Sequence, residues 1–336
     1  MTVEQPGSAP SPDKGSALGK GVDLAQTEVE SLFAQRLAEA FASLGCFNLA
    51  VFGKTGVGKS TLVNAVFGSQ VAETGLGKPV TRGLVYYRHP GGLLGLYDSE
   101  GFETGTSGDE ILAALRSRVA ESRSLPVDQQ IHAAWYLVRW SDRRFEERQG
   151  DFVRALADLG LPVILVITQV PSRDGVPHPE AIEFAQYIES LGLPLRPAGR
   201  ALLTNALEDP FTASPVFGLQ ELLDATYLVV PEVATAALTA VQILDWERKR
   251  QAAKTIITQS VALAAGVGAA PIPFSDAALL VPTQVTMIAR ITAAYGLPAD
   301  RSRALAAAGA VVLTGGATMA GRVQITSTCC GLLGTA

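Results

Sequence analysis

Cysteine and histidine are scarce in this chain, and their scarcity excludes several kinds of site. The 336 residues contain three cysteines, Cys46, Cys329 and Cys330, which are too few and too unevenly placed for a disulfide framework or a four-ligand zinc site. The three histidines show no metal-ligand spacing. This cysteine usage is typical of a reducing compartment, so we expect a cytoplasmic protein.

An excess of positive charge is also missing. The chain has 27 basic and 32 acidic residues, which gives a net charge of -5. Proteins that bind nucleic acid by neutralising many phosphates need a basic surface, so no DNA binding is expected. Any polyanion that this chain binds must be held locally, by a small number of groups.

The N-terminus lacks the apolar run of a signal peptide. Residues 1–21 are instead rich in Ser, Pro, Gly and Lys, a composition that predicts a disordered leader. From residue 22 onward the pattern becomes structured. The apolar residues that recur at three- and four-residue spacing are Leu32, Phe33, Leu37, Ala40 and Phe41. This spacing predicts an amphipathic helix.

Charge is nearly absent from the C-terminal quarter. Residues 255–275 and residues 304–321 carry none, and their lengths make both candidates for membrane spans. However, Pro271 and Pro273 shorten the first stretch, and the second consists mostly of Ala, Gly and Thr. Two alternatives fit this pattern about equally well: a helical bundle with tight small-residue packing, and insertion into or peripheral association with the inner membrane.

The most informative motif follows the apolar run 46–52, which has the length of a strand. It reads G-x-x-x-x-G-K-S and consists of Gly53, Lys54, Thr55, Gly56, Val57, Gly58, Lys59 and Ser60, with Thr61 next in the chain. This is the sequence of a phosphate-binding loop: its glycines let backbone N–H groups converge on the phosphates. Lys59 is expected to reach the β and γ oxygens, and Ser60 is expected to be a ligand of Mg²⁺. A glycine-rich turn without a ligand is the alternative.

A second motif ends the next apolar strand, expected at 93–97. It reads Asp98-Ser99-Glu100-Gly101, a D-x-x-G sequence. Asp98 can hold Mg²⁺ through water, and the Gly101 amide can bond the γ-phosphate and so sense whether it is present. An ordinary Asp/Gly turn is the alternative.

The stretch Gly58–Gly68, which reads GKSTLVNAVFG, resembles the Era-like branch of bacterial GTPases. The resemblance covers roughly residues 45–230 and implies GTP and GDP as ligands with Mg²⁺ as cofactor. It further implies that Thr81 is the switch threonine that closes over the metal when GTP is bound. A turn threonine without that role is the alternative.

The sequence departs from this family where hydrolysis is concerned. Many GTPases have a glutamine directly after D-x-x-G to orient the attacking water, but this chain has Phe102. We therefore expect slow intrinsic turnover, with the water positioned by backbone, by Glu103, or by a partner or second protomer in a nucleotide-dependent dimer. Arg143 and Arg144 are candidates for an arginine finger in trans, although a solvated helix start explains them more simply.

A second departure concerns the base. After the strand expected at 163–167 the family has Asn/Thr-Lys-x-Asp, whose carboxylate accepts the N–H donors of guanine. This chain has Thr168-Gln169-Val170-Pro171 instead. Asp174 lies three residues further on and could swing in to supply the carboxylate, an alternative that its offset leaves open. Thr168 and Gln169 remain assigned to the base. The later segment 202–206 resembles the loop that touches the guanine oxygen, which assigns Asn205 and Ala206 to the same site. Guanine is thus favoured over adenine by the whole set of motifs and not by this one.

The order of expected elements predicts an α/β fold. Residues 22–230 form a P-loop NTPase G domain, including the N-terminal helix, with a mostly parallel sheet covered by helices on both faces. Helices are expected near 109–122 and 219–229. Residues 231–336 form an all-α, hydrophobic, Ala/Gly-rich C-terminal domain.

The C-terminal domain starts with a long helix expected at 232–253. Its basic end, Arg248 to Arg250, suits an anionic lipid surface, although a solvated helix end is the simpler explanation. The segment 271–277 resembles the signature of a helical domain of unknown function, often called YcjF-like, that follows G domains in various bacterial proteins.

These observations predict a P-loop GTPase of the switch type. Residues 231–336 would pass the state of the nucleotide to a membrane surface or a protein partner. A nucleotide-binding scaffold that does not hydrolyse is the main alternative, and an ATPase is the next.

Overall fold

The chain divides into two units in the structure, which is a computed structural model. It describes residues 14–68, 78–81, 84–89, 91–99, 108–122, 124–208, 214–268 and 276–297. The first unit consists of Met1–Glu39, Ile256–Arg290 and Ala299–Ala336, and the second consists of Ala40–Thr255 and Ile291–Pro298. The second unit thus continues past residue 230, where the G domain was expected to end, because the residues that follow pack into its core: Ala234, Ala237 and Leu238 are fully buried there.

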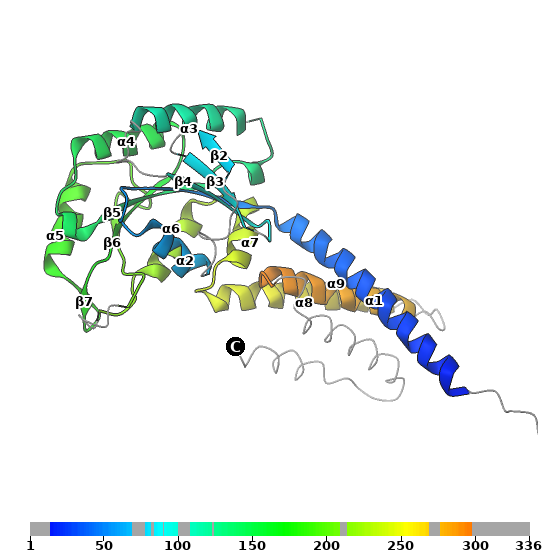
Figure 1. Ribbon diagram of the computed structural model, residues 1–336. Coiled ribbons are helices and arrows are strands. Elements are labelled where there is room, and N and C mark those ends of the chain that lie inside the picture. Colours follow the sequence, from blue (N-terminus) through cyan, green and yellow to red (C-terminus); the bar gives the residue numbers. More distant parts are fainter. Residues whose placement is uncertain are drawn as a thin grey trace, which may run out of the picture. The chain divides into compact units, whose positions relative to one another are not determined.

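Seven strands form the main sheet within the described residues, in the order β2-β3-β4-β1-β5-β6-β9 (Figure 1). Their bounds are β1 Phe47–Phe52, β2 Lys78–Thr81, β3 Leu84–Arg88, β4 Leu94–Ser99, β5 Ala133–Arg139, β6 Val163–Thr168 and β9 Ala201–Leu203. Strands β4, β1, β5, β6 and β9 pair in parallel, whereas β3 is antiparallel to both of its neighbours. Strands β1 and β6 are buried at every position, as expected of parallel strands covered on both faces.

Helices cover both faces of this sheet (Figure 1). One face packs against α3 (Gly108–Ser122), α4 (Glu147–Asp158) and α5 (Pro179–Ser190). The other packs against α2 (Lys59–Phe67), α6 (Leu219–Val229) and α7 (Glu232–Val241). The carboxyl ends of parallel strands form the ligand-binding edge of such a sheet, and the carboxyl ends of β1, β4 and β6 lie at this edge. The predicted α/β class is confirmed.

Helix α1 spans Lys14–Leu44 and so begins before residue 22, where the helix was expected to start. Residues 14–21, which the sequence placed in the leader, belong to this helix, and residues 1–13 lie outside the described residues. Extending an existing helix adds one hydrogen bond for each residue that is fixed. Glycine weakens such an extension by about 1 kcal/mol relative to alanine without preventing it.

The single helix expected over 232–253 is in fact two. Helix α7 ends at Val241 and α8 spans Trp246–Gly268. The carboxylate of Asp245 accepts a hydrogen bond of 2.9 Å from the Arg248 amide and thereby caps the start of α8. An aspartate three residues before the amide that it caps is a sequence signal for the start of a helix, and here it lies inside the single helix that was predicted.

Helix α9 spans Asp276–Ala294 and contains Pro282. The described C-terminal region is therefore helical, as predicted, while most of the YcjF-like segment, residues 271–275, and all of 304–321 lie outside the described residues. Within the ranges given above, none of the helices combines the length and apolar character that crossing a bilayer requires.

Candidate functional site

The phosphate loop joins β1 to α2, and its backbone takes conformations that favour glycine. Gly53 has φ 146° and Gly58 has φ 94°. A Cβ atom added at Gly53 would lie 2.6 Å from the carbonyl oxygen of Leu137 in β5. The loop can therefore pass this close to β5 because residue 53 has no side chain.

The ammonium of Lys59 lies across the phosphate loop. Its Nζ atom donates hydrogen bonds to the carbonyl oxygens of Gly53, at 2.9 Å, and Lys54, at 3.3 Å. Lys59 is also the first residue of α2, whose N–H groups and dipole favour an anion at the same place. Thr55, Gly56, Ser60 and Thr61 are exposed, so the loop offers an open cradle that fits a phosphate chain.

Two residues that the sequence assigned to the base hold this loop from the side of β6. Thr168 Oγ1 donates to the carbonyl oxygen of Val57 at 2.6 Å, and Gln169 Nε2 donates to that of Gly56 at 3.0 Å. Thr168 is buried and ends β6, whereas the bond from Gln169 is exposed. Both side chains therefore brace the phosphate loop.

A third brace was not anticipated from the sequence. Lys54 Nζ forms an ion pair with Glu146 Oε1 at 2.9 Å, and Glu146 is the N-cap of α4, in a capping box with Gln149. The hydrogen bond from Lys54 lowers the pKa of the Glu146 carboxyl. The S/T-x-x-E/Q form of the capping box would not have revealed it, because glutamate occupies the N-cap here.

Asp98 lies at the same edge of the sheet as the loop. It is in register with Val51 of β1, two residues before Gly53, and its Oδ1 atom is buried. The Asp98 carboxylate and the Ser60 hydroxyl are hard oxygen donors of the kind that Mg²⁺ prefers. The residues present at this edge therefore fit a magnesium ion associated with phosphate.

Comparison with known proteins agrees with this geometry. A family model described as 50S ribosome-binding GTPase matches residues 48–169, the span from β1 through the braces after β6. The GTPase Era of Stenotrophomonas maltophilia is 27% identical over 191 residues. Residues 48–169 therefore have the P-loop GTPase fold and are similar to this family, Era included.

The chain spans only part of the length of the curated relative that it matches. The Stenotrophomonas alignment covers 53% of this chain and 60% of that protein. Solved structures that resemble this GTPase domain include Era of Aquifex aeolicus bound to GDP and AlF4⁻, at 19% identity, covering 56% of this chain and 58% of that one with a TM-score of 0.37. A probable GTP-binding protein, EngB, has 18% identity, covering 54% of this chain and 97% of that one, also at 0.37.

The switch residues of the GTPase domain are described in part. Thr81 ends β2, an outer strand that pairs with β3, and its role at the metal stays a prediction. Gly101, Phe102 and Glu103 lie outside the described residues. The sensing of the γ-phosphate and the positioning of water therefore stay predictions as well.

The segment after β6 contains a hairpin that the sequence analysis missed. Strands β7 (Ser172–Arg173) and β8 (Val176–Pro177) are antiparallel, and Asp174 and Gly175 between them have φ 52° and φ 78°. Two positive φ angles are what a type I′ turn requires, and Asp-Gly is a preferred sequence for it. The turn accounts for the backbone of Asp174, and a contact of its carboxylate with a base stays a prediction.

Asn205 and Ala206 follow β9 at the same edge of the sheet. Asn205 is buried, exchanges backbone hydrogen bonds with Phe217, and donates from Nδ2 to the Pro215 carbonyl oxygen at 2.9 Å. Its side chain thus holds the loop before α6. The assignment of Asn205 and Ala206 to the base therefore depends on their backbone and stays a prediction.

The arginines proposed as a finger precede α4. Arg143 has φ 47°, forms an ion pair with Glu180, and lies over the Trp140 ring at 5.5 Å. These local contacts account for Arg143, while Arg144 is exposed. Helix α4 itself begins at Glu147, so neither arginine is part of its first turn.

Proposed function

We propose that the Era-like domain binds GTP and GDP with Mg²⁺ at the phosphate loop and hydrolyses GTP slowly, as a molecular switch. The observation that carries this proposal is the position of the Lys59 ammonium on the carbonyl oxygens of Gly53 and Lys54, at the start of α2. It supplies positive charge beside the open backbone of the loop. The match to the GTPase family supports guanine nucleotides over other phosphates.

The residues then take the following roles. The Lys59 ammonium binds the β and γ oxygens, and the Ser60 and Asp98 oxygens hold the metal, directly or through water, with Thr81 added when GTP is bound. When bound, Mg²⁺ neutralises charge that develops on the phosphate oxygens. The Gly101 amide bonds the γ-phosphate, so its contact is lost after hydrolysis.

Substitution of Lys59 tests the site. Lys59→Ala is expected to abolish binding of GDP and GTP, measured by calorimetry on the full chain. Lys54→Ala is the matched control: it removes a lysine from the same loop, but one whose ammonium pairs with Glu146, so affinity should change by less than about threefold. Wild-type affinity in Lys59→Ala would remove the assignment of the phosphate loop.

Titrations with GTP and ATP test the base. We expect tighter binding of GTP, although Pro171 stands where the family has its guanine-binding carboxylate. Backbone groups near Asn205 and Ala206 would then make the distinction. Tighter binding of ATP would remove the assignment of the base site to guanine and favour the ATPase alternative.

Release of phosphate in a single turnover tests hydrolysis. The hydrophobic Phe102 in place of glutamine predicts slow release. If bound GTP is never hydrolysed, with or without added lipid, the protein is a nucleotide-binding scaffold. A change in mass on exchanging GDP for a GTP analogue, measured by light scattering, would support the nucleotide-dependent dimer.

We further propose that residues 231–336 connect the switch to a protein partner or a membrane surface. The basic run Arg248 to Arg250 does not support this proposal, because the side chains of Arg248 and Lys249 form hydrogen bonds within the second unit. Support comes from the uncharged stretch 255–275, which begins inside α8. Co-sedimentation of the full chain with lipid vesicles that is lost on deleting residues 255–336 would favour a membrane. No pelleting of the full chain would favour a protein partner, and pelleting that the deletion leaves unchanged would count against a membrane role for these residues.

A further inference from the structure

The last turn of α2 is bonded to the linker between α7 and α8. The amide of Ile243 donates to the carbonyl oxygen of Val66 at 2.9 Å. The last four carbonyls of a helix have no partner within it, so the linker satisfies one of these at the end of α2. The helix that begins at the phosphate loop therefore ends on the residues that lead into α8.

The linker, residues 242–245, has a fixed shape. Gln242 is fully buried, and its Oε1 atom accepts hydrogen bonds of 2.7 Å from the amides of both Leu244 and Asp245. Its Nε2 atom donates to the Asp245 carbonyl oxygen at 2.8 Å. A buried polar side chain with satisfied donors and acceptors specifies one backbone arrangement.

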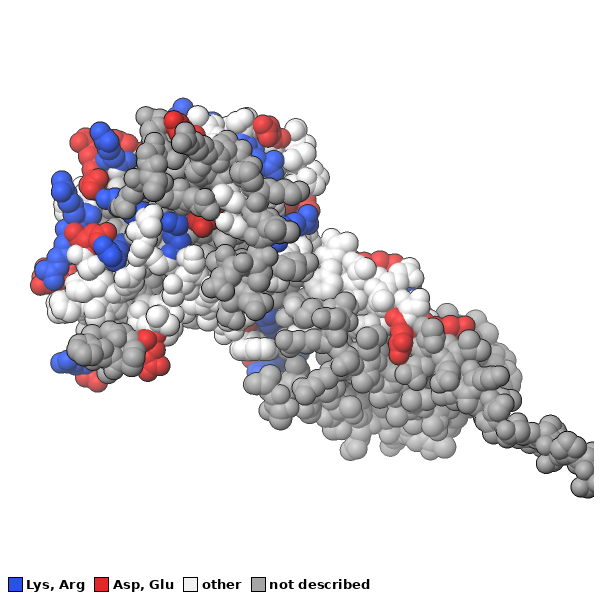
Figure 2. Space-filling view, viewed as in Figure 1, with Lys and Arg blue, Asp and Glu red and all other residues white. Residues whose placement is uncertain are grey.

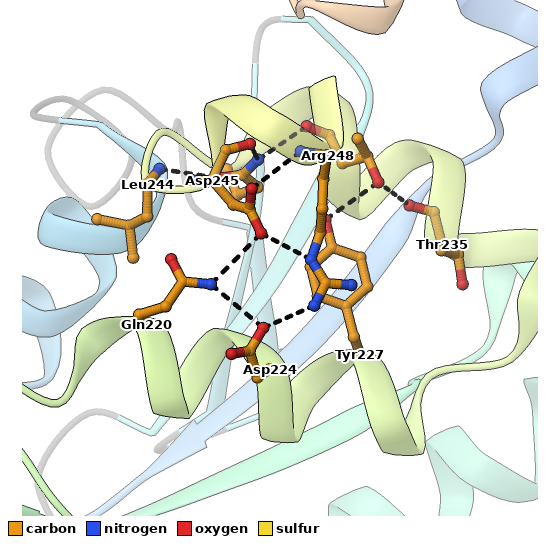
Figure 3. A network of polar contacts seen from close by, with 9 residues as sticks. Gln220, Asp224, Tyr227, Thr235, Leu244, Asp245 and Arg248 are labelled. Atoms are coloured by element: carbon orange, nitrogen blue, oxygen red, sulfur yellow. Dashed lines mark hydrogen bonds and ion pairs between the residues drawn. The ribbon is translucent and has the colours of Figure 1, made fainter. Parts of the chain in front are cut away.

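Arg248 fastens the first turn of α8 to α6 (Figure 3). Its Nε atom donates to Asp245 and its Nη2 atom to Asp224, each at 2.7 Å, and the guanidinium lies 4.1 Å from the centre of the Tyr227 ring. We call Asp224, Tyr227, Asp245 and Arg248 the Arg248 clamp. Burial opposes ionisation of Asp245, but the bonds from Arg248 outweigh it and lower the pKa of that carboxyl.

We propose that the Arg248 clamp couples occupancy of the phosphate loop to the first turn of α8. Helix α2 has 9 residues, so it is a short rigid element of about 13 Å. Its first residue, Lys59, must exchange its carbonyl acceptors for phosphate oxygens, and its last turn is held by Ile243. The inference rests on the proposed function, because it needs a nucleotide at the loop.

Coupling of this kind is reciprocal. If nucleotide favours the ordered linker by some factor, then loss of that order must weaken nucleotide binding by the same factor. The structure also limits where the effect arrives: Trp246–Thr255 of α8 belong to the second unit, and the later residues of α8 belong to the first.

Hydrogen exchange of the full chain with and without GDP and Mg²⁺ tests the first half of the proposal. We expect the amides of Ile243 and Arg248 to exchange at least about fivefold more slowly when GDP is bound. In the same samples, calorimetry reports whether GDP binds at all. GDP binding with unchanged exchange at both amides would overturn the coupling and leave the nucleotide site intact.

Arg248→Met tests the second half. The substitution keeps an apolar side chain but removes the guanidinium that bonds Asp224 and Asp245. GDP affinity should therefore fall by about fivefold. Arg250→Met is the matched control, since Arg250 is exposed and pairs with Glu247 on its own helix; its affinity should equal that of the wild type. Equal affinity in Arg248→Met would overturn the proposal.

Asp224→Asn is a milder variant in case Arg248→Met does not fold. It leaves α8 unaltered and removes the charge on α6 that pairs with Arg248. It should weaken GDP binding in the same direction, and it should have no further effect when added to Arg248→Met. Additive effects of the two substitutions would contradict a shared clamp. Failure of the wild type to bind any nucleotide would instead overturn the proposed function itself.

Discussion

The phosphate loop and the Arg248 clamp both depend on basic side chains, but their partners lie at different distances along the chain. Lys59 binds carbonyl oxygens five and six residues away. Arg248 binds Asp224, 24 residues away, and Lys249 binds Tyr295, 46 residues away. A local partner makes the role of Lys59 readable from a motif, whereas the partners of Arg248 and Lys249 appear only in the folded chain.

These distant partners correct the interpretation of Arg248 to Arg250 as a solvated helix end or a surface for anionic lipid. Arg248 pairs with two carboxylates, and Lys249 is buried, with its ammonium on the carbonyl oxygens of Ala240 and Tyr295. Charge counted along a sequence therefore overstates the charge that a surface presents. On the face of the second unit that Figure 2 shows, basic and acidic side chains lie intermixed.

The largest effect is expected from Gly53→Ala in the phosphate loop. The new Cβ atom would meet the Leu137 carbonyl oxygen at 2.6 Å, in a backbone region that disfavours side chains. We expect a loss of about 3 kcal/mol in the free energy of unfolding and loss of nucleotide binding. Urea denaturation and calorimetry measure the two effects.

Gly56→Ala separates the clash from the backbone angle. Gly56 has φ 80°, but a Cβ atom there has nothing within 4 Å. It should cost about 1 kcal/mol, the usual penalty for a left-handed residue. If both variants lost the same stability, the close approach of the loop to β5 would not be what requires Gly53.

Much of the fold could be predicted because its signals are local. The strand before the phosphate loop, the motif itself and the Asp98 strand are contiguous segments, and their residues are found where the sequence placed them. The Asp174-Gly175 turn and the Asp245 cap were equally local, but they fell inside segments already given another interpretation. The pairing of Lys54 with Glu146, 92 residues away, had no local signal.

The next largest effect concerns Lys249 and pH. Burial lowers the pKa of Lys249 to about 8, against 10.5 for the exposed group. Between these values the unfolded chain binds more protons than the folded one, so this lysine makes stability rise with pH, by up to about 1.4 kcal/mol per pH unit. From pH 8 to pH 10, wild type should gain roughly 2 kcal/mol relative to Lys249→Met.

The difference in stability between the two proteins isolates this group, because they differ in no other ionisable side chain. Gln251→Met is the control, since Gln251 is exposed on the same helix and carries no ionisable group. Its difference from the wild type should not change over this range. If the difference in stability between wild type and Lys249→Met did not change with pH, Lys249 would be hydrated in solution and would not bond the carbonyl oxygens at the ends of α7 and α9.

A smaller effect is expected at the brace from β6. Thr168→Val keeps the shape of a buried side chain but removes the donor to the Val57 carbonyl oxygen, which should cost about 1 kcal/mol. Gln169→Ala removes an exposed bond and should cost less. Urea denaturation measures both, and a larger loss in Gln169→Ala would reverse the order of the two braces.

The smallest effect is expected from Glu146→Gln. This substitution removes the carboxylate that pairs with Lys54, 92 residues away in the sequence. Both side chains are more than 30% exposed, so water and salt screen the pair and the loss should be at most about 0.5 kcal/mol. Because Lys54 lowers the pKa of Glu146, the contribution is present above pH 4.5 and is lost as the pH falls and the carboxylate is protonated. Stability measured at pH 7 in low and high salt should differ between wild type and Glu146→Gln in low salt only. A loss that persists in high salt would show that the carboxylate acts chiefly as the N-cap of α4, and the loop would then be braced from β6 alone.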